Sequence, residues 1–175
     1  AERVVAAGLA TQRSSVVCWD KRNGKPLSPV LSWQDRRNAR FVERMRDQAA
    51  SVRAQTGLVL SPHYGASKLR WCLDEIAAVR TARDEKRLAL GPLSSFLLYS
   101  LLDEHPYVVD PANASRTQLW DPQTRAWSTA LAAQFGIPAE LLPRPANTRH
   151  VFGHLTFSGK QVPLVVCTGD QSAAL

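Results

Sequence analysis

Residues 162–171 read VPLVVCTGDQ, an uncharged apolar run that passes directly into a polar turn. A continuous apolar run of this length indicates a strand that is buried on both faces, so we predict a buried strand over 162–167. The turn Thr168-Gly169-Asp170-Gln171 follows at once. Proteins that combine helices and strands place their chemistry at such strand ends.

The first part of the chain contains three short β-rich runs, at residues 4–10, 15–19 and 30–33. The dipeptide Asn23-Gly24 is a strong turn signal between the second and the third run. We therefore predict that the chain opens with an antiparallel meander.

Apolar residues then recur at helical spacing. Gly57 is the predicted C-terminal stop of the first helix, and Pro106 follows the third. The predicted helices cover residues 37–55, 67–76, 94–102, 131–135 and 139–142. This mixture of strands and helices indicates an α/β or α+β fold.

Composition limits the function classes. At 175 residues and 45% hydrophobic content, the chain forms one domain or part of one. The net charge of +7 comes from arginines dispersed among acids, with no aromatic stacking array, so we predict no nucleic-acid partner. No apolar run is long enough to span a membrane and the N-terminus lacks a signal-peptide pattern, so we predict no membrane association.

The three cysteines, Cys18, Cys72 and Cys167, are far apart and lie in apolar runs. This pattern is typical of buried reduced thiols, and it predicts a cytoplasmic protein. The four scattered histidines form no zinc motif, so no metal site is predicted.

Six segments resemble, in order and spacing, those of the FGGY carbohydrate kinase family, and most of all its glycerol kinase-like branch. They are GLATQR (8–13), WDKRNGKPL (19–27), SWQDRR (32–37), SPHYGASKLRW (61–71), DPANASRT (110–117) and TGDQSAA (168–174). The resemblance implies an α/β fold of the ribonuclease H-like, actin and hexokinase ATPase type, with helices flanking a mixed sheet.

By the same resemblance, residues 1–175 are expected to form part of the N-terminal, substrate-side domain. The first phosphate-loop hairpin and the C-terminal nucleotide domain are expected to lie outside these residues, and the 175 residues alone to be inactive. The implied function is phosphorylation of a hydroxyl on a small sugar or polyol, with ATP and Mg²⁺ as cofactors and no assigned cofactor-binding residues. The alternative is a sugar- or partner-binding relative that transfers no phosphate. The sequence leaves the oligomeric state open, and a homo-oligomer is one of the alternatives.

Phosphoryl transfer to an alcohol needs a carboxylate that accepts the hydroxyl proton. The resemblance places Asp170 in this catalytic role. The residues alone favour another interpretation, in which Asp170 caps a helix that begins at Gln171.

A neutral polyol is held by side chains with several donors or acceptors and by a flat apolar wall. Gln12, Arg13, Trp33 and Gln171 have these properties, and the resemblance places the last three at substrate-contacting positions. The alternatives are a solvated strand-end charge for Arg13 and a core aromatic for Trp33.

The chain also departs from the glycerol kinase-like pattern. Ser14 stands where that branch has a glutamate, and His63 where it has a tyrosine. His63 is a candidate substrate contact or an ordinary surface residue, and the neighbouring Tyr64 could replace it if the loop shifts by one residue. Since a polar site rejects substrates that leave its groups unpaired, these changes argue against glycerol itself. Gly65 also replaces the family's small hydroxyl residue.

Two further residues of the matched segments have open roles. Lys68 matches the family's lysine and is either a solvated helix residue or a structural or anion-contacting one. Asn113 is predicted to stabilise a turn.

Overall fold

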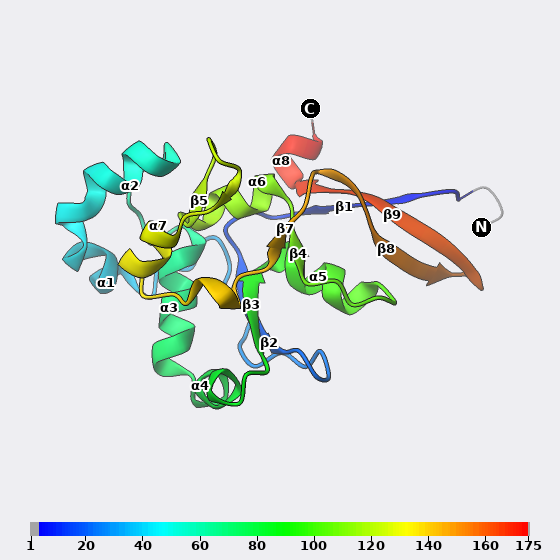
Figure 1. Ribbon diagram of the computed structural model, residues 1–175, viewed down its shortest axis with the longest axis horizontal. Helices are drawn as coiled ribbons and strands as arrows, with labels where there is room; N and C mark the ends of the chain where they lie inside the picture. The colour runs from blue at the N-terminus through cyan, green and yellow to red at the C-terminus, as the bar shows by residue number, and fades with distance from the viewer. Residues whose placement is uncertain (1–3, 175) are drawn as a thin grey trace.

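The computed structural model describes residues 4–174, which contain both helices and strands along their whole length (Figure 1). The strands are β1 (Ala7–Thr11), β2 (Val16–Asp20), β3 (Leu88–Pro92), β4 (Val108–Val109), β5 (Trp120–Asp121), β6 (Ala126–Trp127), β7 (Arg144–Pro145), β8 (Arg149–Phe157) and β9 (Lys160–Gly169). The α-helices are α1 (Ala39–Arg44), α2 (Ala49–Thr56), α3 (Gly65–Glu75), α4 (Ala77–Asp84), α5 (Leu93–Leu101), α6 (Pro111–Ala114), α7 (Thr129–Gln134) and α8 (Asp170–Ala173). The 3₁₀ helices are η1 (Arg46–Gln48), η2 (Ser115–Thr117) and η3 (Ala139–Leu141).

The largest sheet has the order β1-β9-β8 and is mixed. β9 pairs in parallel with β1 and forms an antiparallel hairpin with β8. Thr11 at the end of β1 is in register with Gly169 at the end of β9. The two strands therefore end side by side, and the turns that follow them start next to each other.

The strand predicted at 162–167 is present as part of β9, but the prediction that both its faces are buried is wrong. Val162, Leu164 and Cys167 are buried, whereas Val165 and Val166 are partly exposed. One face packs in a core cluster with residues of α5 and β8. The β8–β9 hairpin extends away from the main group of helices in Figure 1, which leaves its other face uncovered.

The predicted antiparallel meander is confirmed only in part. Residues 26–31 return antiparallel to β2 after the Asn23-Gly24 turn, with bridges from Trp19 to Pro26 and from Val16 to Leu31. The first run does not join them, because β2 pairs with β3, about seventy residues further along the chain, and not with β1. β3 provides an uninterrupted apolar partner, so every residue of β2 and β3 is buried.

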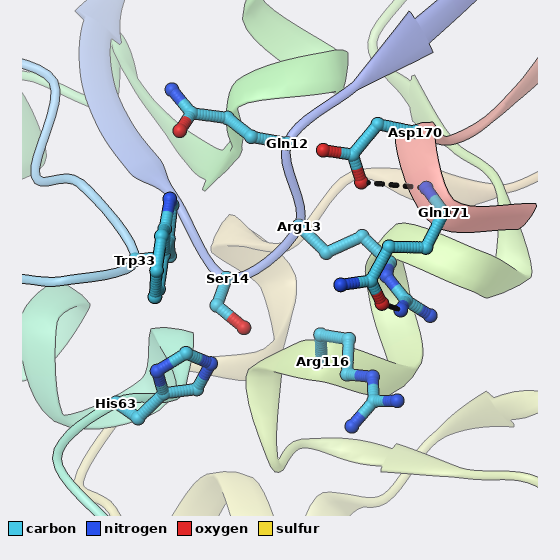
Figure 2. Close-up of a pocket in the computed structure, with 8 residues that line it drawn as sticks. All are labelled: Gln12, Arg13, Ser14, Trp33, His63, Arg116, Asp170 and Gln171. Carbon is cyan, nitrogen blue, oxygen red and sulfur yellow. Dashed lines mark hydrogen bonds between the residues drawn. The ribbon is translucent and has the colours of Figure 1, made fainter. Parts of the chain in front are cut away.

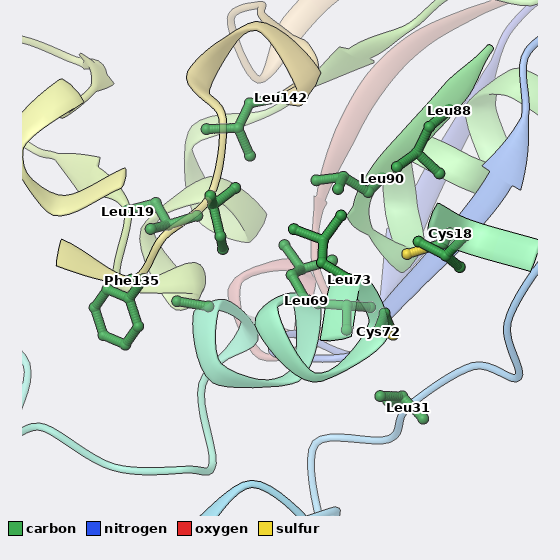
Figure 3. Packing of buried hydrophobic residues seen from close by; sticks show 14 of the residues in the cluster. Cys18, Leu31, Leu69, Cys72, Leu73, Leu88, Leu90, Leu119, Phe135 and Leu142 are labelled. Atoms are coloured by element: carbon green, nitrogen blue, oxygen red, sulfur yellow. The ribbon is translucent and has the colours of Figure 1, made fainter. Parts of the chain in front are cut away.

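The two faces of the β2–β3 pair pack against different layers. Figure 3 shows Cys18, Leu88 and Leu90 on the side of α3, which contributes Leu69 and Cys72. On the other face, Trp19 contacts a group of aromatic rings, Phe96, Tyr99 and Tyr107. This burial on both faces makes the β2–β3 pair the centre of the fold.

The helix predicted over 37–55 is divided into α1, η1 and α2. Asp47 lies in the first turn of η1, as expected for a residue type that favours helix starts over helix interiors. Gly57 ends α2 in the left-handed conformation, with φ of 71°, and this stop is confirmed. No helix within residues 4–174 is long and apolar enough to cross a bilayer.

Candidate substrate pocket

A polar pocket of about 290 Å³ lies where β1 and β9 end. This volume is close to the lower limit of typical small-molecule sites, about 300 Å³. The residues that line it, drawn in Figure 2, are Gln12, Arg13, Ser14, Trp33, His63, Arg116, Asp170 and Gln171. The structure thus brings together every predicted site residue except Tyr64, from four separate parts of the chain.

Asp170 is the first residue of α8, directly after the last residue of β9. Its side chain is exposed, and Oδ1 accepts a hydrogen bond from the backbone N–H of Gln171 at 2.8 Å. The helix-cap position falls on Gly169, one residue earlier than the cap interpretation of Asp170 requires. The carboxylate has no basic side chain within ion-pair distance among the described residues, so it is free to accept a proton or a hydroxyl hydrogen bond.

Arg13 follows β1 and reaches across to α8, where its Nη2 donates to Oε1 of Gln171. Its side chain lies directly over Gly169, since a Cβ added there would lie 2.7 Å from Arg13 Cγ and closer still to Cδ. Ser14 takes up the left-handed conformation, with φ of 65°, in the turn after Arg13. Turn and glycine together place the partly exposed Arg13 side chain at the pocket.

Trp33 and His63 form the wall opposite α8 in Figure 2. Their ring centroids are 5.7 Å apart, edge to face, and 42% of Trp33 is exposed, so Trp33 is not a core aromatic. Burial, followed by the nearby charges of Lys68, Arg116 and Arg36, lowers the pKa of His63. At neutral pH this imidazole is therefore uncharged.

Tyr64 lies next to His63, and its ring meets the His63 ring edge to face at 5.0 Å. It occupies the cap position of α3 and does not line the pocket. The structure thus places His63, and not Tyr64, at the pocket wall.

Lys68 on α3 is fully buried, so the solvated-residue interpretation is wrong. Its ammonium group donates to three backbone carbonyls, those of Ser14 at 2.8 Å, Ser32 at 2.8 Å and His63 at 2.7 Å. Each acceptor belongs to, or adjoins, a pocket-lining residue. Lys68 thereby links the three pocket loops that carry these carbonyls. Burial lowers its pKa to about 8, and Asp35 acts in the opposite direction.

A second buried network holds the two strand ends together. Thr11 Oγ1 donates to Asn113 Oδ1 at 3.1 Å, and Asn113 Nδ2 donates to Asp110 Oδ1 at 2.8 Å. Cys167 Sγ lies 3.4 Å from the same Asp110 oxygen. Asp110 also caps α6 through the backbone N–H of Asn113, so Asn113 stabilises this turn as predicted. Burial raises the pKa of Asp110.

Arg116 was not among the predicted site residues. It follows α6 in η2 and lines the pocket, where Figure 2 shows it below Arg13 and Gln171. Its position inside the matched segment 110–117 was the only available signal, because nothing in its local sequence separates it from the many surface arginines.

Fold and pocket together define a domain of the actin and hexokinase ATPase class, as seen in sugar kinases. The chain belongs to the FGGY family of carbohydrate kinases, since the model of the family's N-terminal domain matches residues 1–175. It is 38% identical over 178 residues to a glycerol kinase of Solidesulfovibrio magneticus, with 99% of this chain and 36% of that protein aligned.

Solved structures agree with this assignment. A Plasmodium falciparum glycerol kinase crystallised with ADP matches with a TM-score of 0.89 and 25% identity, over 97% of this chain and 35% of its own. A xylulose kinase of Rhodospirillum rubrum matches with a TM-score of 0.78 and 22% identity, over 98% and 35%. The chain therefore spans about a third of the length of the relatives it matches.

Proposed function

We propose that the protein carrying this chain transfers a phosphoryl group from ATP to a hydroxyl of a small sugar or polyol. The observation that carries the proposal is the free carboxylate of Asp170 in a small polar pocket with Arg13 and Gln171. The relatives named glycerol kinase and xylulose kinase support this class of reaction.

In the proposed mechanism, Gln171, Arg13 and Gln12 hydrogen-bond the substrate hydroxyls, and the Trp33 ring forms an apolar wall for the carbon chain. Asp170 accepts the proton of the substrate hydroxyl as the oxygen of that hydroxyl bonds to the γ-phosphorus of ATP and the bond from this phosphorus to ADP breaks. The start of α8 at the end of β9 fixes this carboxylate on a rigid element, so little reorganisation is needed.

ATP with Mg²⁺ would supply the phosphoryl group and neutralise the charge that develops on it. Within residues 4–174, no three acidic, histidine or cysteine side chains gather into a metal site. We propose that Mg²⁺ enters with the nucleotide. The three buried free cysteines support the further proposal of a cytoplasmic location.

The decisive experiment replaces Asp170 by asparagine in the whole protein and follows ADP release with a panel of sugars and polyols. We expect turnover to fall by about 10²- to 10⁴-fold with an unchanged melting temperature. Asp84→Asn, a carboxylate on the exposed surface of α4, is the matched control and should keep full activity.

Near-normal phosphorylation by Asp170→Asn would falsify the assignment of the base. The alternative, a protein that binds sugars without phosphoryl transfer, predicts saturable sugar binding by calorimetry and no ADP release from the wild type.

A further inference from the structure

A buried group of polar side chains lies close along the chain to three parts of the pocket. It consists of Thr11 at the end of β1, Cys167 in β9, and Asp110 and Asn113 at the start of α6. None of these four residues is among those that line the pocket. Each is at most 5% exposed, so water cannot replace a partner that one of them loses.

Three members of this group precede a pocket residue by one to three positions. The pairs are Thr11 with Gln12, Asn113 with Arg116, and Cys167 with Asp170. The backbone hydrogen bonds between β1 and β9 already hold two of these parts together. The side-chain group adds the third part, because it attaches α6 to both strands.

The hydrogen bonds of the group depend on the polarity of each side chain. Both oxygens of Asp110 accept, so the amide of Asn113 turns its Nδ2 toward Asp110 Oδ1, at 2.8 Å, and its Oδ1 away from it. The amide oxygen then needs a donor, and the Thr11 hydroxyl donates to it at 3.1 Å. The side-chain link between β1 and α6 therefore depends on one hydroxyl group.

Capping of α6 does not account for this group. A cap needs one acceptor for the backbone N–H of Asn113, and Asp110 Oδ2 supplies it at 3.1 Å. The other oxygen, Oδ1, accepts from the Asn113 side chain and from Cys167 Sγ, which lies 3.4 Å away.

The carboxylate of Asp110 is also costly to bury. Within residues 4–174 it has no basic side chain within ion-pair distance, and burial raises its pKa. The ionised form is therefore less stable here than in the unfolded chain. A serine or threonine cap would avoid this cost, so the second oxygen of Asp110 has a role beyond the cap.

We propose that Asp110 and Asn113 are positioning residues of the pocket. They hold the α6–η2 segment, which carries Arg116, against the ends of β1 and β9. Neither residue contacts the substrate. The proposal rests on the proposed function and deepens it, because a displacement of about 1 Å at a reacting site can lower the rate by about 10²-fold.

The test uses a pair of variants at Thr11 in the whole protein. Thr11→Val keeps the shape of the side chain and removes its hydroxyl, whereas Thr11→Ser keeps the hydroxyl. KM and kcat are measured by ADP release, and Kd by calorimetry, with glycerol, D-glucitol and D-xylulose as probes. We expect Thr11→Val to raise the KM and Kd of a probe about five- to tenfold and to lower kcat about ten- to a hundredfold. Thr11→Ser should stay within about threefold of wild type.

Ser28→Ala is the matched control for stability. Ser28 is also buried and lies outside the pocket. Its Oγ accepts from the backbone N–H of Cys18 at 3.0 Å and donates to the carbonyl of Pro29 at 2.9 Å. This variant should also lower the melting temperature, but without a change in KM or Kd. A smaller folded fraction lowers kcat and leaves KM unchanged, so KM and Kd separate positioning from stability.

Three results would overturn the proposal: unchanged KM and Kd in Thr11→Val, equal losses in Thr11→Val and Thr11→Ser, or an equal rise of KM in Ser28→Ala. Asp110→Asn serves if Thr11→Val does not fold. It keeps the shape of the group but turns an N–H toward a donor that Asp110 now accepts, and it should raise KM and Kd in the same way.

The two hypotheses fail differently. If the wild type phosphorylates a probe and Thr11→Val does so with the same constants, the positioning role fails and the kinase function stands. If the wild type phosphorylates no probe, the kinase function fails and the Kd values still test the positioning role. If no probe binds, crystal structures of the wild type and Thr11→Val decide: a displaced Arg116 supports positioning, and an unmoved one overturns it.

Discussion

At the scale of single residues, close contacts at the pocket determine which amino acid can stand at a given position. Gly169 is the clearest case, because the Arg13 side chain occupies the space where any other residue would place its Cβ. Gly169 has an ordinary backbone conformation, with φ of −77°. The requirement for glycine here is therefore one of space and not of backbone freedom.

We predict that Gly169→Ala displaces Arg13 and weakens substrate binding about tenfold or more, with a stability loss of about 1–3 kcal/mol. Gly8→Ala is the matched control on the neighbouring strand, since its Cβ would lie at an ordinary 3.7 Å from Val166. Calorimetry and urea unfolding of both variants check the prediction. Equal effects at the two glycines would show that the contact with Arg13 is unimportant.

At the scale of elements, α3 organises the pocket although it places no side chain inside it. Lys68 extends from this helix to carbonyls of three loops that arrive from different parts of the chain. A buried ammonium with three acceptors is well satisfied, whereas buried carbonyls without donors are costly. The helix thus fixes the relative positions of Ser14, Ser32 and His63.

We predict that Lys68→Met lowers the free energy of unfolding by about 2–4 kcal/mol and weakens ligand binding, because three buried carbonyls lose their donor. Lys25→Met, at an exposed loop lysine, is the control and should change stability by less than about 0.5 kcal/mol. Denaturant unfolding and calorimetry measure both effects. Wild-type stability in Lys68→Met would contradict a structural role for the ammonium.

The same lysine predicts a pH dependence. Its pKa is about 8 in the folded protein, below the usual 10.5, so the unfolded chain binds more protons between these values. The free energy of unfolding contributed by Lys68 therefore rises with pH in this window and is independent of pH below it. The stability difference between wild type and Lys68→Met should grow from pH 8 to pH 10 in urea titrations. A constant difference would mean that the three carbonyl acceptors keep the pKa near its usual value.

At the scale of the whole molecule, the chain is about a third as long as the relatives it matches. The pocket is open, and the described residues offer no assigned site for a nucleotide. We propose that residues 1–175 are part of the N-terminal, substrate-side domain, and that a nucleotide domain and a phosphate-loop hairpin complete the enzyme.

We predict that these 175 residues, expressed alone, release no ADP above background with any sugar, polyol or sugar acid. Coupled ADP assays measure this, with the whole protein as the positive control. Circular dichroism should establish that the fragment is folded. Sustained turnover by a folded fragment would refute the need for a second domain.

The sequence by itself determined the family, the strand that leads to Asp170 and the residues of the turn after β1. These are local features: apolar runs, a glycine turn and short ordered motifs are set by neighbours along the chain. The end of a helix could be predicted for the same reason where the sequence contains a stop residue, as Gly57 does after α2. The strands β3 and β8 were missed because their apolar residues lie beside helix and turn signals that local patterns cannot resolve.

Only the tertiary structure decided how β2 pairs, why Lys68 is buried and that Arg116, and not Tyr64, lines the pocket. These properties depend on contacts between distant parts of the chain, such as Arg13 with Gln171 and Lys68 with Ser14. A lysine on a helix and an arginine after a turn have the same local pattern whether they are solvated or enclosed. Their environment is set by which strands and loops pack around them, and the linear sequence does not specify that packing residue by residue.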